Sequence, residues 1–252
     1  LEDDNKVDKG GYDATTVRVD EGATFTMNGG ELNNICDYTF AIENYGTTTV
    51  KGGKATSVHT TVANYGTIYI EGGEFVCNGL EGITAHAVWA AEGTTNISGG
   101  TFDGKDNYNG FNVCASKGAT VNIKGGKFLP VHSGSLYGEG TIIVKGGEFF
   151  DNPSKRVASG YEVVEENGVY TVAKSQAVVA FEEAIAQGGE VTLNADITLA
   201  ETVVIESGKT VVLNLNGKTL TATDYAIENY GTLTINGNGK TLTSTAGRAI
   251  NV

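Results

Sequence analysis

Apolar and polar residues alternate in short runs through the first part of the chain, and each run ends at a pair of glycines. In one such run Gly66 is followed by Ile68 and Ile70. The pair Gly72-Gly73 then precedes Phe75. A period of two is typical of a β-strand with one buried face. Adjacent glycines permit positive φ at a bend and close approach of neighbouring backbone. The pattern therefore predicts short strands joined by tight glycine corners.

This unit of strand, glycine corner and second strand recurs six times. The glycine pairs begin at Gly29, Gly52, Gly72, Gly99, Gly125 and Gly146, so the period varies between 20 and 27 residues. A repeat of this length is typical of solenoids, in which each coil buries its apolar face against its neighbours. Stacked coils would advance by about 4.8 Å, the distance between paired strands.

The residues just beyond each corner recur at one phase of the repeat. They are Leu32, Ala55, Phe75, Phe102, Phe128 and Phe149. Stacked coils would place them in one inward ladder. The sequence therefore predicts an all-β, right-handed parallel β-helix whose core contains this ladder. The repeats differ in length mainly at 79–85, 103–110 and 130–135. In solenoids such insertions lie on one face, which is often the binding face.

The second part of the chain begins differently. Asn167-Gly168 between alternating apolar runs predicts a hairpin, and apolar residues at helical spacing over 175–187 predict an amphipathic helix. Residues 225–235 then nearly copy residues 40–50. We predict a first stack of about six coils over 1–152, a hairpin and turn junction over 153–174, and a capping helix with the start of a second stack over 175–252.

Composition and charge narrow the possible partners. The chain has 36 glycines, 2 prolines and a formal net charge of -13. This charge would repel phosphate backbones and anionic lipid, which argues against binding to nucleic acid or to a membrane surface. No apolar run reaches the ~18 residues of a membrane span. Cys36, Cys77 and Cys114 lie far apart, which favours buried thiols over a zinc site or a disulfide framework.

The repeat motifs resemble a known superfamily. The repeats Gly-Thr-x-x-Ile-x-Gly-Gly-x-Phe, the hairpin Gly-Tyr-x-Val-x-x-x-x-Gly-x-Tyr-x-Val and the coil Val-x-Leu-Asn-Leu-Asn-Gly-Lys-Thr-Leu resemble the right-handed parallel β-helix, pectate-lyase-like superfamily. More narrowly, they resemble repetitive surface and fibre proteins of gut bacteria and their phages. The resemblance implies an extracellular, cell-surface or virion-surface location. For the catalytic families it implies calcium-binding acids with a basic residue, or several close aspartates, and neither pattern transfers residue by residue.

Two groups of residues are candidates for ligand binding. The loop over 103–110 offers oxygen ligands from Asp103, Asp106 and Asn107, which suit calcium or a sugar, although an ordinary polar turn has the same composition. Trp89, Tyr108 and Tyr137 are candidates for a sugar-stacking surface, because aromatic rings bury apolar area while keeping a polar edge in water. For Trp89, packing within the ladder is the alternative. The chain shows no other indication of a cofactor.

The regular repeats and the lack of a convergent acid, base or nucleophile favour a non-catalytic module, a rigid spacer that presents loops to a glycan or host-surface ligand. The alternative is a polysaccharide lyase or glycoside hydrolase acting in a groove along the β-helix, which for hydrolysis needs paired acids about 5 to 9.5 Å apart. Ice or mineral binding by threonine rows is disfavoured, because Thr-x-Thr does not recur at one phase. The strand at 249–252 has no predicted cap, so we also expect end-to-end self-association through the C-terminal coil.

Overall fold

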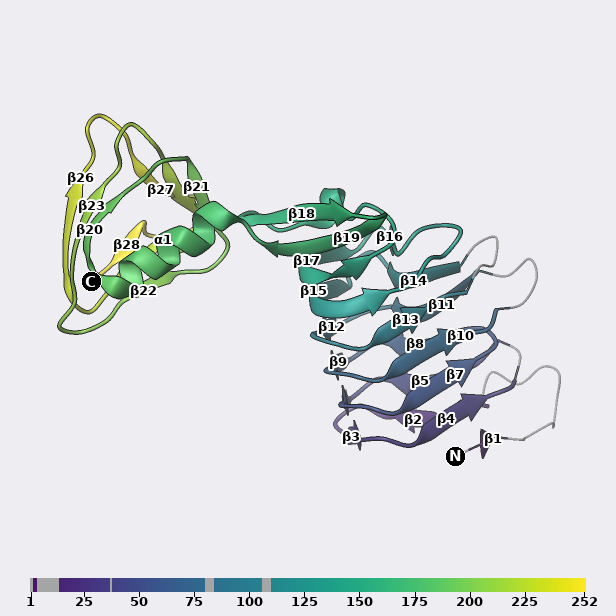
Figure 1. Cartoon of the computed structure of the whole chain (residues 1–252). Helices are drawn as coiled ribbons and strands as arrows, with labels where there is room; N and C mark the ends of the chain where they lie inside the picture. Colours follow the sequence, from purple (N-terminus) through teal and green to yellow (C-terminus); the bar gives the residue numbers. More distant parts are fainter. Residues whose placement is uncertain (1, 4–13, 37, 80–83, 106–109) are drawn as a thin grey trace. The chain divides into compact units, whose positions relative to one another are not determined.

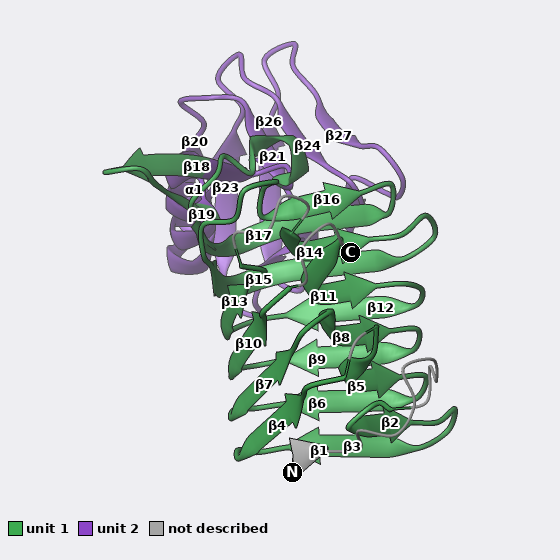
Figure 2. Cartoon of the chain, turned by 90° about the vertical axis from the view of Figure 1, so that its right-hand side faces the viewer, with its two compact units in different colours: residues 1–157, 163–173 green, residues 158–162, 174–252 purple. Residues whose placement is uncertain are grey.

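The chain is an all-β parallel β-solenoid with one α-helix in the part that the structure describes (Figure 1). The computed structural model describes residues 2–3, 14–36, 38–79, 84–105 and 110–252. These residues form two compact units, unit 1 with residues 1–157 and 163–173, and unit 2 with residues 158–162 and 174–252 (Figure 2). The all-β parallel β-helix predicted from the repeats is confirmed.

In unit 1 the coils contribute strands to three faces. The first face contains β3 (Thr24–Met27), β6 (Thr47–Val50), β9 (Thr67–Ile70), β12 (Thr94–Ile97) and the first halves of β15 (Thr120–Phe128) and β17 (Thr141–Phe149). The second face contains β1 (Glu2–Asp3), β4 (Glu31–Asn34), β7 (Lys54–Ser57), β10 (Glu74–Cys77), β13 (Thr101–Asp103) and the second halves of β15 and β17. The third face contains β2 (Val17–Val19), β5 (Phe40–Asn44), β8 (Thr60–Asn64), β11 (Ala85–Ala90), β14 (Gly110–Ala115) and β16 (Leu136–Gly138).

Neighbouring coils pair in parallel and in register, so equivalent repeat positions stack. Phe75, Phe102, Phe128 and Phe149 occupy one column of the second face. Successive ring centroids lie 5.3, 4.9 and 4.5 Å apart, with interplanar angles of 7°, 11° and 2°. Each of these residues is at most 1% exposed. The predicted aromatic ladder is therefore confirmed, and it forms the core of the later coils of unit 1.

The two glycines of each corner serve different purposes. At the corner between β12 and β13, a Cβ on Gly99 would overlap the carbonyl oxygen of Glu71 in the preceding coil. Gly100 has a φ of +97°, which other L-residues rarely adopt. The first glycine therefore allows close stacking of coils, and the second allows the bend. Gly29, in the first coil, meets nothing within 4 Å, which fits this division of roles.

A buried polar ladder accompanies the apolar core. Asn44 and Asn64 are fully buried, and the Asn44 Nδ2 donates to Asn64 Oδ1 at 2.7 Å. Thr48 Oγ1 donates to Asn44 Oδ1 at 2.8 Å, and Asn64 Nδ2 donates to Thr95 Oγ1 at 3.0 Å. A buried amide group costs free energy unless it is hydrogen-bonded. These hydrogen bonds therefore satisfy the buried side chains, and they also favour the register in which the asparagines of neighbouring coils meet.

A hairpin follows the last coil of unit 1. After the 3₁₀ turn η1 (Ser154–Arg156), β18 (Tyr161–Glu166) and β19 (Val169–Lys174) are joined at Asn167 and Gly168, both at positive φ as a two-residue hairpin turn requires. β19 pairs antiparallel with β17, with Phe149 opposite Tyr170. The hairpin predicted at Asn167-Gly168 is therefore present, and it covers the edge of the second half of β17.

Unit 2 is a shorter solenoid that begins with a helix. α1 (Gln176–Gln187) packs against the first coil and buries Val178, Phe181 and Ile185. Ser175 is its N-cap, and its Oγ accepts from the Val178 N–H. Three parallel sheets of three strands each follow. The first contains β20 (Gly189–Thr192), β23 (Thr210–Asn214) and β26 (Thr232–Asn236), and the second contains β21 (Ile197–Leu199), β24 (Leu220–Ala222) and β27 (Leu242–Ser244). The third contains β22 (Val203–Ile205), β25 (Ile227–Asn229) and β28 (Ile250–Asn251).

Candidate ligand-binding surface

The polar loop predicted as an ion or sugar site is described only in part. Asp103 ends β13 and is half-buried, and its Oδ1 accepts a hydrogen bond from the Lys105 N–H at 2.9 Å. Asp106, Asn107 and Tyr108 lie outside the described residues. Within the described ranges, no group of three or more His, Cys, Asp or Glu side chains is arranged to hold a metal ion.

Trp89 and Tyr137, by contrast, share one column of the third face. Trp89 pairs with Cys114 on the next strand, and Cys114 pairs with Tyr137 on the strand after that. Val88 and Ala90, on either side of Trp89, are fully buried, so Trp89 lies on the outer side of the sheet. Tyr137 is 56% exposed. The structure thus brings together two of the predicted aromatic residues, although 48 positions separate them in the sequence.

Further aromatic side chains join them on the outside of the third face. We call the whole set the aromatic surface, which consists of Phe40, Tyr45, Tyr65, Trp89, Phe111 and Tyr137. The Tyr45 and Tyr65 rings stack at 4.6 Å, and the Phe111 and Tyr137 rings stack at 4.3 Å. Trp89 lies between these pairs along the stack. Sequence reasoning missed Phe40, Tyr45, Tyr65 and Phe111, although the recurring Asn-Tyr-Gly of Tyr45 and Tyr65 was a usable signal.

The ring orientations decide which faces can receive a ligand. In each stacked pair, one face of each ring is covered by the other ring. Trp89 is different, because its ring is inclined at 71° to Tyr65 and at 46° to Phe40, with centroids 5.9 and 6.2 Å away. Its Nε1 donates to Ser116 Oγ at 2.9 Å, which holds the indole in place. Trp89 is therefore an anchored, half-exposed ring on which no described aromatic ring stacks.

An ion pair closes one end of the aromatic surface. The Arg18 guanidinium lies 4.7 Å above the Tyr45 ring, and its Nη1 is 3.4 Å from Glu43 Oε2. Tyr45 donates from its hydroxyl to Glu43 Oε1 at 3.0 Å. Burial, followed by this hydrogen bond, raises the pKa of Tyr45 to about 12. Glu43 is 8% exposed and already contacts both Arg18 and Tyr45, so its role is to hold these two side chains.

Two histidines and a cysteine beside the aromatic surface are uncharged at neutral pH. Burial lowers the pKa of His59, and it lowers the pKa of His86 to about 4. The His86 ring lies 5.7 Å from the Phe111 ring, and the His59 ring lies 6.2 Å from the Phe40 ring. Burial also raises the pKa of the Cys114 thiol to about 11. These three groups therefore extend the apolar area around the aromatic rings without adding charge.

The first face carries a row of threonines. Thr-x-Thr does recur at one phase in the first two coils, where Thr24 and Thr26 pair with Thr47 and Thr49, so the expectation that it shares no phase was wrong there. A single column of threonine continues in register through the later coils and consists of Thr24, Thr47, Thr67, Thr94, Thr120 and Thr141. The adjacent outward column changes from threonine to tyrosine, asparagine and isoleucine. The row is one residue wide and has no second threonine column beside it in the later coils.

No protein-family model matches the chain, and neither curated proteins nor solved structures gave a significant match. Within the described residues, no helix has the length and apolar character needed to cross a membrane.

Proposed function

We propose that the chain is a non-catalytic β-helical module of a bacterial surface protein or phage fibre, which acts as a rigid spacer and binds a glycan on the aromatic surface. The observation that carries this proposal is the anchored Trp89 ring between two stacked aromatic pairs. Aromatic rings offer a large apolar contact area at low conformational cost. Because the strand register holds these rings, little ordering is needed when a ligand binds.

The charges around the aromatic surface favour a neutral glycan. Arg18 is engaged by Asp20 and Glu43, and the nearby histidines are uncharged at neutral pH. The aromatic surface therefore has no unengaged cation among the groups described above to neutralise an acidic polymer. The net charge of -13 further disfavours approach of a polyanion. An uncharged sugar ring can pack its C–H face on Trp89 while its hydroxyl groups remain in water.

A rigid spacer is supported by the continuous core. The phenylalanine ladder and the Asn44–Asn64 contact link one coil to the next inside the stack. Binding along the outside of the stack leaves this core untouched. We propose an extracellular, cell-surface or virion-surface setting for such a module.

The test is binding of the full chain to a panel of neutral and acidic glycans, followed by calorimetry on the best neutral ligand. Trp89→Ala should reduce affinity by about tenfold or more, the scale of a central aromatic anchor. Tyr69→Ala is the matched control, because Tyr69 is 44% exposed but lies on the first face. Equal loss in both variants, or no glycan bound at all, would contradict the proposal.

The same preparations test the lyase or hydrolase alternative. We expect no release of unsaturated or reducing-end sugar from acidic or neutral polysaccharides, with or without calcium. Turnover by the purified chain that is lost in Asp103→Ala would establish the enzyme alternative instead.

A further inference from the structure

Unit 2 repeats a short motif that holds an arginine in unit 1. The sequence Ala-Ile-Glu-Asn-Tyr-Gly occurs once in each unit. In unit 1 the motif supplies Glu43 and Tyr45, and the Arg18 guanidinium lies over the Tyr45 ring and beside Glu43 Oε2. Arg18 Nε also donates to Asp20 Oδ1 at 3.0 Å. Two carboxylates and one aromatic ring therefore hold this guanidinium.

The glutamate and the tyrosine of the motif also meet in unit 2. Here the Tyr230 hydroxyl donates to Glu228 Oε1 at 2.8 Å. Glu228 Oε1 also accepts from Asn251 Nδ2 at 3.2 Å. The Tyr230 N–H donates to the Ile205 carbonyl oxygen at 2.8 Å, which matches the 2.7 Å hydrogen bond made by the Tyr45 N–H in unit 1. The two copies of the motif are therefore held in the same backbone arrangement.

The arginine itself is replaced in unit 2. Arg18 pairs in register with the glutamate of its motif, whereas the residue that pairs with Glu228 is Val204. Glu206 follows Val204 by two positions, as Asp20 follows Arg18. Unit 2 thus keeps both carboxylates and the aromatic ring, while a short apolar side chain stands where unit 1 has the guanidinium.

The ring and the carboxylates of unit 2 are open to solvent. Tyr230 is 62% exposed. The hydrogen bond to Glu228 and the charge of Glu228, with a smaller contribution from Glu206, raise the pKa of Tyr230. Lys209, whose backbone borders the same corner, directs its Nζ to the Gln187 carbonyl oxygen at 3.5 Å. The arrangement is therefore an exposed aromatic ring beside two anionic groups.

We propose that Glu206, Glu228 and Tyr230 bind the guanidinium group of an arginine carried by a partner protein. Glu228 Oε2 would accept from one edge of the planar group and the Tyr230 ring would cover its face, as the equivalent residues of unit 1 do for Arg18. Arginine suits this site better than lysine, because a planar guanidinium stacks on an aromatic ring and presents several N–H groups to a carboxylate. The net charge of -13 favours the approach of a basic partner. The site lies in unit 2 and does not depend on the proposed glycan binding by unit 1.

The experiment is an NMR titration of the full chain with N-acetyl-arginine amide at low salt, followed at the Tyr230 and Gly231 amide signals. Saturable binding in the millimolar range is expected, and added salt should weaken it because exposed charges are screened. Glu228→Gln should weaken binding by about two- to fivefold, the scale of an exposed ion pair. Glu190→Gln is the matched control, because it removes the same charge from a different sheet of unit 2 and should bind normally.

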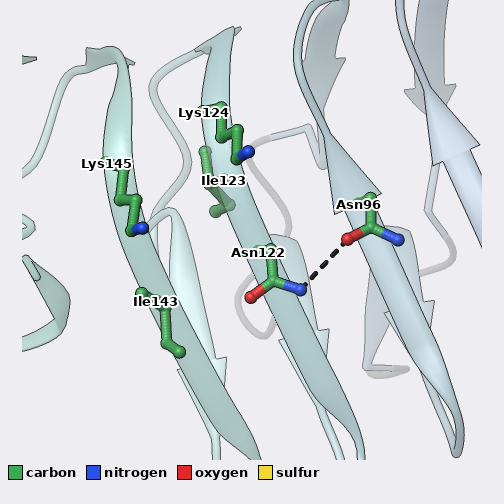
Figure 3. Close-up of a pocket in the computed structure, with 6 residues that line it drawn as sticks. All are labelled: Asn96, Asn122, Ile123, Lys124, Ile143 and Lys145. Carbon is green, nitrogen blue, oxygen red and sulfur yellow. Dashed lines mark hydrogen bonds between the residues drawn. The ribbon is translucent and has the colours of Figure 1, made fainter. Parts of the chain in front are cut away.

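A groove on the first face of unit 1 provides a reference region for the same titration (Figure 3). It is lined by Asn96, Asn122, Ile123, Lys124, Ile143 and Lys145, so no carboxylate borders it. A bulge inserts Lys145 into β17 here, between the residues that pair with Ile123 and Lys124. A cationic ligand should leave the amide signals of these residues unchanged. Equal shifts here and at Tyr230 would indicate nonspecific binding and would overturn the site.

Exchanging the residue that differs between the two motifs gives a sharper test. Val204→Arg should fill the site from within the chain and abolish binding of N-acetyl-arginine amide. Arg18→Val should uncover the equivalent groups of unit 1 and add a second binding event at the Tyr45 signals. Unchanged binding in Val204→Arg, no second event in Arg18→Val, or equal loss in Glu190→Gln would each contradict the proposal.

Other ligands test the chemistry of recognition. N-acetyl-citrulline amide has a similar shape without the charge and should not bind, and N-acetyl-lysine amide should bind more weakly than the arginine compound. Equal affinity for the lysine compound would overturn the guanidinium part of the proposal. Tighter binding of free L-arginine would overturn the assignment to a partner protein, and no binding of N-acetyl-arginine amide would overturn the site itself.

Discussion

Truncation of Phe102 to alanine tests whether the aromatic ladder carries the stability of unit 1. Phe102 is fully buried, and its ring lies between Phe75 at 5.3 Å and Phe128 at 4.9 Å. β13 pairs with the strands on both sides, so the backbone cannot easily move in to fill the space left by the ring. Truncation of a buried phenylalanine typically costs about 3–5 kcal/mol, which includes the cavity left behind.

A second variant gives an expected difference in the free energy of unfolding. Phe75 stacks on Phe102 on one side, while its in-register neighbour on the other side is Ala55. Phe75→Ala therefore removes one ring stack, whereas Phe102→Ala removes two. Since each aromatic pair is worth about 0.5–1.5 kcal/mol beyond its burial, Phe102→Ala should be the more destabilising by about that amount.

Urea unfolding followed by tryptophan fluorescence is the suitable assay, because Trp89 is the only tryptophan and lies in unit 1. The exposed Tyr69→Ala variant should change the free energy of unfolding by no more than about 0.5 kcal/mol. The m-value should be compared between variants, because a changed slope would indicate loss of two-state behaviour. A cost for Phe102→Ala below about 1 kcal/mol, or one smaller than that of Phe75→Ala, would refute the reasoning.

Three further predictions address the corner, a buried base and the coil edge. Gly99→Ala should lower the free energy of unfolding by about 1–3 kcal/mol because its Cβ would overlap the preceding coil, whereas Gly29→Ala should be close to neutral in the same urea unfolding assay. The pKa of His86 falls from 6.5 to about 4 on folding, so between these pH values the unfolded chain binds more protons than the folded chain. The free energy of unfolding should therefore decline as the pH falls from about 6.5 to about 4. His86→Leu should make this decline shallower when unfolding is measured as a function of pH, and an unchanged pH dependence would contradict the prediction. β26, β27 and β28 each pair on one side only, so sedimentation should show a mass that rises with concentration and is reduced by Thr234→Lys, which adds a charge to the edge strand β26. A strictly monomeric mass at high concentration would be evidence against self-association.

The interior of the solenoid could be predicted from the sequence because its constraints are local and repeated. A phenylalanine two positions after each of the last four glycine pairs identifies both the strand face and the stacking partner, so Phe75, Phe102, Phe128 and Phe149 could be placed together from spacing alone. The same holds for the Asn167-Gly168 turn and the helix that follows Ser175, where a few adjacent residues determine the backbone.

The outer surfaces were harder to predict because they depend on register between coils of unequal length. Phe40 and Trp89 come into contact across two coils whose loops differ, so their separation in the sequence gives no indication of it. The bulge at Lys145 was also hidden, since Lys-Gly-Gly occurs identically at Lys51 and Lys124. The candidate loop at Asp106, Asn107 and Tyr108 lies outside the described residues, so its predicted ligand role remains a prediction.

The parallel, in-register pairing of the coils has a mechanical consequence. Hydrogen bonds between coils run along the stack, and each coil is held mainly by its immediate neighbours. Tension applied through the ends of unit 1 would load the outermost interface first and peel coils away one after another. Each event would release one repeat of 20 to 27 residues and uncover one rung of the core. The force–extension curve of such a stack would be a staircase of small, similar steps, with no single large rupture.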